Sequence, residues 1–160
     1  KLGGGAIDVL FYGMLNGYRR GRLAELRRYG LQVFHANANG PAFGAGLHRL
    51  LRRTKIVLNL RFFDGETEWK MTRFLRPLAN RVLVLSETCG SPAEMAAWGD
   101  AVVFRNDTAA LARTAAWYLR HSGARHTRAD AAYHVFRRNA AAEALREPLR
   151  KLVKQASCGG

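Results

Sequence analysis

"IDVLFYGMLNGYRRGRLAELRRYG", residues 7–30, begins as a buried strand and continues as a helix. Residues 7–12 are mostly apolar, as expected for a strand covered on both faces. Leu23 and Leu26 then lie three apart, which is the spacing of one helix face. The change falls at residues 13–16, and arginines follow within a few positions. This junction is either a turn before a solvated basic helix or a site that binds an anion at the start of that helix.

The same alternation continues along the chain. Further short apolar runs occupy residues 31–35, 55–62, 81–86 and 101–104. Between them, apolar residues recur at helical spacing: Leu47, Leu50 and Leu51; Met71, Phe74, Leu75 and Leu78; Leu111, Ala115 and Tyr118. Asp107 is placed to cap the last of these helices. Strands that alternate with helices predict an α/β fold, a Rossmann-like doubly wound parallel sheet of about five strands.

The domain organisation follows from this pattern. A chain of 160 residues suits one domain, which we place at residues 7–120 after a disordered start at 1–6. Residues 121–160 are expected to form a C-terminal helical extension. It comprises a polar connection at 121–130 and a basic helix at 131–155, which Pro148 is expected to kink or break. Leu145, Leu149 and Leu152 share a helix face beyond the point where the sheet already has its helices, so we expect the segment after about residue 141 to pack less on this domain than the earlier helices do. The alternative is an ordinary surface helix that closes this domain's own core.

Composition limits the function classes. Hydrophobic residues make up 48% of the chain, which excludes wholesale disorder, and no apolar run reaches the roughly 18 residues of a membrane span. Cys89 and Cys158 lack the spacing of a disulfide framework or a metal site, so we expect a cytoplasmic protein without a metal. The net charge of +14 predicts an anionic partner: nucleic acid, acidic lipid or a phosphorylated small molecule.

Candidate binding residues follow the expected strands, because doubly wound sheets bind ligands at the carboxyl ends of their strands. The first junction holds Gly13, Asn16, Arg19 and Arg20. Gly13 allows a tight turn, and either arginine could bind a phosphate through two hydrogen bonds. The stretch is neither a G-x-G-x-x-G motif nor a P-loop, so a solvated basic face explains it equally well.

The third and fourth strands end in further polar residues. Asn59 and Arg61 close the third strand, and Ser86 and Glu87 end the fourth. A glutamate at a strand end, facing the same edge of the sheet as arginines, favours a functional role over a purely structural one.

Two other groups have simpler explanations. His35, Asn37 and Asn39 follow the second strand, where nucleotide folds often hold a ribose or base. An ordinary polar turn accounts for them, and we prefer that interpretation for His35. Glu66 and Glu68, in the loop after the third strand, either accept hydrogen bonds from sugar hydroxyls or favour the start of the next helix.

Five blocks of the sequence occur in a distinctive order. They are residues 7–33, then TKIVLNL (54–60), RFLRPLANRVLVLSE (73–87), GDAVVF (99–104) and DTAALARTAAWYL (107–119). In this order they resemble the group 1 glycosyltransferases, and most closely the CgeB-like spore-maturation branch. The likeness extends over about residues 7–137. It implies the GT-B architecture of two Rossmann-like domains, with this chain as the C-terminal domain that binds the nucleotide-sugar donor.

The resemblance also implies site residues. Gly13, Asn16, Arg19 and Arg20 fall where that family holds the donor diphosphate. Arg73, Ser86, Glu87 and Glu94 match residues of the CgeB-like pattern. Such enzymes need no metal, because cationic side chains and a helix dipole can offset the charge of the leaving diphosphate.

The chain departs from the family at several points. Many group 1 enzymes carry two glutamates eight positions apart before the fourth strand, whereas the positions eight beyond Glu66 and Glu68 hold Phe74 and Arg76. Asn80-Arg81 replaces the usual glycine before that strand. The N-terminal acceptor-binding domain, expected in the same or a partner chain, is missing. We assign no catalytic residue for this reason.

Three functions are therefore open. The preferred one is the donor-binding half of a glycosyltransferase that uses a nucleoside diphosphate sugar, incomplete as an enzyme on its own. The alternatives are a basic α/β module that binds nucleic acid and a Rossmann-like domain for another phosphorylated ligand. Nucleic acid is disfavoured because no recognition helix or aromatic stacking platform stands out.

Overall fold

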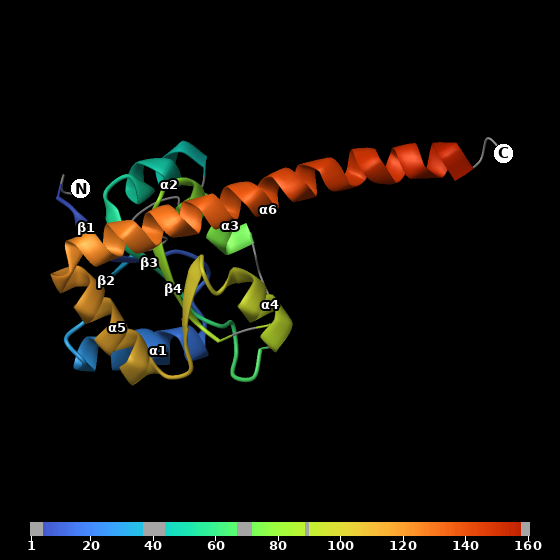
Figure 1. Ribbon diagram of the computed structural model, residues 1–160. Coiled ribbons are helices and arrows are strands. Elements are labelled where there is room, and N and C mark those ends of the chain that lie inside the picture. Colours follow the sequence, from blue (N-terminus) through green and yellow to red (C-terminus); the bar gives the residue numbers. More distant parts are fainter. Residues whose placement is uncertain (1–4, 37–43, 67–71, 89, 158–160) are drawn as a thin grey trace.

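The computed structural model describes residues 5–36, 44–66, 72–88 and 90–157. The strands of this part are β1 (Ile7–Phe11), β2 (Val33–His35), β3 (Thr54–Asn59), β4 (Leu83–Glu87) and β5 (Val102–Arg105). The helices are α1 (Gly17–Arg28), α2 (Gly44–Leu51), α3 (Thr72–Ala79), α4 (Pro92–Trp98), α5 (Thr108–Arg120) and α6 (Ser122–Ser157). These strands form one parallel sheet in the order β2-β1-β3-β4-β5, which confirms the predicted α/β fold (Figure 1).

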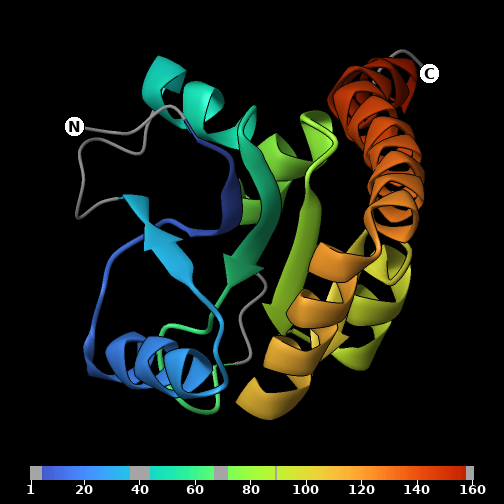
Figure 2. The same ribbon diagram turned by 90° about the vertical axis from the view of Figure 1, so that its left-hand side faces the viewer.

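Helices cover both faces of the sheet (Figure 1 and Figure 2). Leu26 of α1 and Leu111 of α5 pack together with strand residues on one face. On the other face, Leu50 of α2, Leu78 of α3 and Ala132 of α6 pack against the sheet. Both faces are therefore buried, which explains why the strands are apolar throughout rather than alternately polar.

Side chains define where several helices begin. The Asn16 side chain accepts a hydrogen bond from the Arg19 backbone N–H (3.0 Å) and caps α1. Asp107 caps α5 through the Ala110 N–H (2.6 Å), which confirms the cap predicted there. Ser91 and Glu94 form a capping box at the start of α4.

The predicted start of the C-terminal helix was wrong. Residues 121–130 were expected to form a polar connection, yet α6 begins at Ser122, directly after the end of α5. Gly123 is the one strong helix breaker in this stretch, and it falls in the first turn, where it interrupts little. Ala129, Ala132 and Val135 are buried at helical spacing, so packing against the sheet stabilises the helix from its first turns.

The break predicted at Pro148 is also absent. The helix α6 is continuous from Ser122 to Ser157, through Pro148. A proline removes one backbone hydrogen bond, but the remaining bonds of the ladder can carry the helix past it. The second half of α6 extends beyond the sheet and its covering helices (Figure 1).

Candidate functional site

The candidate site lies at the carboxyl ends of β1 and β3. The chain leaves β1 toward β2 on one side, while β3 lies on the other side of β1. This reversal of strand order is the place where doubly wound sheets form a ligand crevice. The loops after β1 and β3, residues 12–16 and 60–66, line this end of the sheet.

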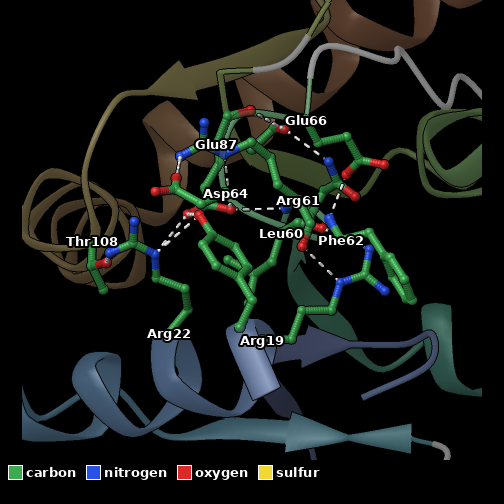
Figure 3. Close-up of polar contacts among 12 residues, drawn as sticks. Arg19, Arg22, Leu60, Arg61, Phe62, Asp64, Glu66, Glu87 and Thr108 are labelled. Atoms are coloured by element: carbon green, nitrogen blue, oxygen red, sulfur yellow. Dashed lines mark hydrogen bonds and ion pairs between the residues drawn. The ribbon is translucent and has the colours of Figure 1, made fainter. Parts of the chain in front are cut away.

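Arg19 joins these two loops from inside the protein. Its guanidinium donates hydrogen bonds to three backbone carbonyls, those of Met14, Leu60 and Arg61, each at 2.9 Å. Figure 3 shows Arg19 together with Leu60 and Arg61. Its exposed fraction is 1%, and it lies over the Phe62 ring. Burial, helped by the positive charge of nearby Arg73, lowers the pKa of the Arg19 guanidinium to about 10. Arg19 therefore braces the site, and its charge does not face solvent.

The same contacts explain why β3 is shorter than predicted. A strand was expected over residues 55–62, but β3 ends at Asn59. The carbonyls of Leu60 and Arg61 accept hydrogen bonds from the Arg19 side chain, so the backbone turns out of the sheet at this point.

Asn16 adds a second connection between the loops. Its Oδ1 caps α1, and its Nδ2 donates a hydrogen bond to the Phe62 carbonyl. Both ends of the amide are thus used within the protein. The structure brings Asn16 to the predicted site, where it holds the loop after β3 against the start of α1.

Gly13 and Arg73 face each other beside this brace. Gly13 has a φ of +131°, which side-chain-bearing residues rarely adopt. A Cβ at this position would lie 3.5–3.6 Å from the Arg73 guanidinium. No residue in the described part of the chain makes a hydrogen bond or ion pair with that guanidinium. Arg73 therefore presents an unpaired positive charge against the backbone of the first turn.

Tyr12 and His35 surround the same turn. The Tyr12 hydroxyl donates a hydrogen bond to the Arg73 carbonyl (2.6 Å), which ties the end of β1 to α3. Burial raises the pKa of Tyr12 to about 12, against the opposite effect of the positive charges on Arg73 and Arg76. His35 Nε2 lies 3.2 Å from the Gly13 carbonyl oxygen.

Asn59 and Ser86 form a buried pair between neighbouring strands. They are register partners in β3 and β4, and Asn59 Nδ2 donates a hydrogen bond to Ser86 Oγ (2.9 Å). Ser86 Oγ donates in turn to the Glu87 carbonyl (2.7 Å). This pair lies beneath the site and fixes the ends of the two strands relative to each other.

Glu87 is a fully buried carboxylate held by donors on several elements. It accepts hydrogen bonds from the Tyr18 hydroxyl (3.0 Å) and the Arg61 backbone N–H (2.8 Å). Arg22 Nε lies 3.2 Å from one of its oxygens, and Arg61 Nε lies 3.8 Å from the other (Figure 3). Arg22 also reaches Thr108 Oγ1 at the start of α5. Glu87 is therefore an internal counterion for two arginines.

The predicted residues thus fall into two groups. Gly13, Asn16, Arg19 and Arg73 gather at the loop after β1, and Asn59, Ser86 and Glu87 gather at the ends of β3 and β4. The Arg20 side chain is exposed on α1 and makes no hydrogen bond or ion pair within the described residues. The Glu94 carboxylate lies in the α4 capping box, where the hydrogen bond from the Ser91 backbone N–H lowers its pKa.

Sequence reasoning missed Tyr18, Arg22 and Thr108. Tyr18 and Arg22 are four residues apart on α1, and their mutual hydrogen bond (3.1 Å) could have been predicted from that spacing. Their contacts with Glu87 and Thr108 join residues 69 and 86 positions apart, for which the sequence carries no signal.

The comparisons with known proteins give no family. Neither a protein-family model nor a curated protein sequence matches this chain. Within the described residues, no three His, Cys, Asp or Glu side chains gather as metal ligands would. The helices of that part also include none that is long and apolar enough to cross a bilayer.

Proposed function

We propose that this domain binds the diphosphate of a nucleoside diphosphate sugar at the turn after β1, as the donor-binding half of a glycosyltransferase. The observation that carries the proposal is the Arg73 guanidinium, which has no hydrogen-bond or ion-pair partner among the described residues and lies beside Gly13, where the strand order reverses. The sequence resemblance to group 1 glycosyltransferases supports the sugar-nucleotide part of the proposal.

Arg73 suits a diphosphate better than the other arginines of the site. Arg19 is buried on carbonyl groups, while Arg22 and Arg61 are paired with Glu87. An unpaired guanidinium offers two parallel N–H donors, a geometry that matches phosphate oxygens. The positive end of the α1 dipole, at Gly17, adds to the attraction.

The chemistry that this arrangement could support is loss of a diphosphate leaving group. A guanidinium and a helix dipole stabilise the negative charge that develops on the diphosphate as the sugar departs. A metal ion is not required for this role. The acceptor and any general base would come from an N-terminal domain in the same or a partner chain.

Calorimetry with a panel of nucleoside diphosphates and their sugars tests the proposal. We expect Arg73→Met to weaken binding by about 1.5–3 kcal/mol, the contribution of hydrogen bonds to a charged group. Arg76→Met is the matched control, because Arg76 is exposed one turn later on α3 and should change affinity little. Absence of binding at millimolar nucleotide, by protein shown to be folded, would overturn the proposal.

A salt titration separates the alternatives, which rest on the net charge of +14. Nucleic acid releases many counterions on binding, so its affinity should fall steeply with salt, whereas a small ligand at Arg73 should respond weakly. Tight, salt-sensitive DNA or RNA binding without nucleotide binding would favour the nucleic-acid module. Equal affinity for pyrophosphate and for nucleoside diphosphates would favour another phosphorylated ligand.

A further inference from the structure

The backbone of the turn after β1 is hydrogen-bonded to a histidine side chain of the neighbouring strand β2. His35 Nε2 lies 3.2 Å from the carbonyl oxygen of Gly13. A carbonyl oxygen can only accept a hydrogen bond, so Nε2 carries the proton in this contact. The Gly13 carbonyl is therefore held toward β2, the strand to which His35 belongs.

The His35 ring is itself held in place by the sheet. His35 and Phe11 are register partners in β2 and β1, and their ring centroids lie 5.5 Å apart. Phe11 is fully buried, so the imidazole contacts a side chain that is packed in the core. Gly13 lies two residues after Phe11 along the chain, and the Nε2–H of His35 points to its carbonyl oxygen.

The direction of one carbonyl fixes the direction of the next N–H. In a trans peptide the C=O and N–H bonds point in opposite directions, and the described residues contain no cis peptide. With the Gly13 carbonyl turned toward β2, the Met14 N–H points to the other side of β1. This N–H has no hydrogen-bond partner among the described residues.

We infer that the Met14 backbone N–H is a second phosphate donor beside Arg73, and that His35 is the positioning residue that aims it. This inference rests on the proposed function and names the backbone group that would share the bound diphosphate. The Met14 carbonyl is held by Arg19 (2.9 Å), so the residue is fixed on both sides of its Cα. Such a fixed N–H needs no reorganisation when an anion arrives.

Three variants test the inference, with inorganic pyrophosphate as the probe. His35→Gln keeps an N–H donor at the same distance along the side chain, whereas His35→Met removes it at similar size. We expect about a tenfold loss of pyrophosphate affinity in His35→Met and less than twofold in His35→Gln. His48→Met is the control, because His48 is an exposed histidine on α2 and should leave affinity unchanged.

The chemical shift of the Met14 amide proton, measured by nuclear magnetic resonance, distinguishes loss of this contact from a general loss of stability. On addition of pyrophosphate, the Met14 amide proton should shift downfield in the wild type and in His35→Gln, and should move much less in His35→Met. Binding in the wild type without a Met14 shift would overturn the inference and leave the proposed function standing. If pyrophosphate does not bind, the same Met14 shift is read with a nucleoside diphosphate; if that does not bind either, the proposed function fails, and with it the role of Met14 as a ligand.

The positioning role of His35 is measured separately in the ligand-free protein. His35→Met should change the amide resonances of Gly13, Met14 and Leu15, and His35→Gln should largely restore them. Identical spectra for this turn in all three proteins would show that His35 does not hold it.

Discussion

Arg19 and Arg20 are neighbours on α1, yet Arg19 is buried on three carbonyl groups and Arg20 stands in solvent. Replacing Arg19 by Met would leave those carbonyls without their donors in a place that water reaches poorly. Each buried group that loses its partner costs about 1–3 kcal/mol, so we expect Arg19→Met to lower the unfolding free energy by about 3 kcal/mol or more.

Urea denaturation measures this difference, with Arg20→Met as the matched control. An exposed substitution usually changes stability by less than about 0.5 kcal/mol. Equal effects of the two substitutions would contradict the bracing role of Arg19. The hydrogen bonds of Arg19 also hold the loops of the site together. We therefore expect Arg19→Met to weaken phosphate binding, although the Arg19 side chain does not contact the ligand.

Tyr12 gives a prediction in the alkaline range. Its pKa is raised to about 12, so at pH 11 it should still be protonated while exposed tyrosines have largely ionised. The tyrosinate absorbance of wild type and Tyr12→Phe should therefore be nearly equal at pH 11. A deficit of one tyrosinate in the variant would show that Tyr12 titrates normally.

The same shift affects stability with a definite sign. The unfolded chain releases the Tyr12 proton near pH 10, before the folded protein does, so the stability that Tyr12 contributes is complete below pH 10 and is lost as pH rises toward 12. The lowered pKa of Arg19 acts in the opposite direction over this range. Arg19 is present in both proteins, so its effect cancels when wild type and Tyr12→Phe are compared.

At the scale of elements, the turn from α3 to β4 has an unusual backbone. Arg81 has a φ of 54°, in the left-handed region that favours glycine. Its side chain is exposed and pairs with Asp130 (2.7 Å) and the Tyr133 ring. Asn80-Arg81 stands where the group 1 glycosyltransferases that the sequence resembles usually have a glycine, and the backbone of Arg81 has a conformation suited to glycine.

Two substitutions at Arg81 separate its backbone from its side chain. Arg81→Ala loses the ion pair and keeps the strained conformation, whereas Arg81→Gly loses the same ion pair and relieves the strain. We expect Arg81→Gly to melt at a higher temperature than Arg81→Ala in a calorimetric scan. The reverse order would mean that the left-handed conformation costs nothing at this turn.

How much of these elements the sequence predicts depends on the range of their interactions. Apolar runs and the Asp107 cap are local signals, and they located the five strands and the start of α5, although β3 ends three residues earlier than the run at 55–62 predicted. The start of α6 was missed because polar residues at 122–130 look like a loop until the burial of Ala129 is known. The role of Arg19 was beyond prediction, since two of its three carbonyl partners are 41 and 42 residues away.

At the scale of the whole molecule, the positive charge is not concentrated in the site. Arg22 is paired with Glu25 and Glu87, and Arg61 with Glu87 and Asp64. Most of the excess charge therefore lies elsewhere on the surface, where salt screens it. This distribution is the reason to expect weak salt dependence for a ligand bound at Arg73.

The second half of α6 should contribute little to the stability of the domain. Burial of α6 side chains is described for residues 122–139, and there Ala129, Ala132 and Val135 are buried in the core. Figure 1 shows the second half extending past the other helices. We expect deletion of residues 144–160 to change the melting temperature by less than about 4 °C, equivalent to about 1 kcal/mol for a domain of this size.

A shorter chain ending at residue 128 is the control for this deletion. It also loses Ala129, Ala132 and Val135, the buried apolar residues of α6, so its melting temperature should fall far more. A large fall after removal of residues 144–160 alone would show that the end of α6 belongs to the core of this domain.

The length of α6 also determines how the molecule turns in solution. At about 1.5 Å per residue, its 36 residues form a rod of about 54 Å. A compact body with such a rod attached rotates more slowly end over end than about its long axis. Helical N–H bonds lie along the helix axis, so α6 amides report the slow rotation, whereas amides of the sheet report a mixture of both. Nitrogen-15 relaxation rates in this protein therefore depend on bond direction, and fast transverse relaxation along α6 is a consequence of shape.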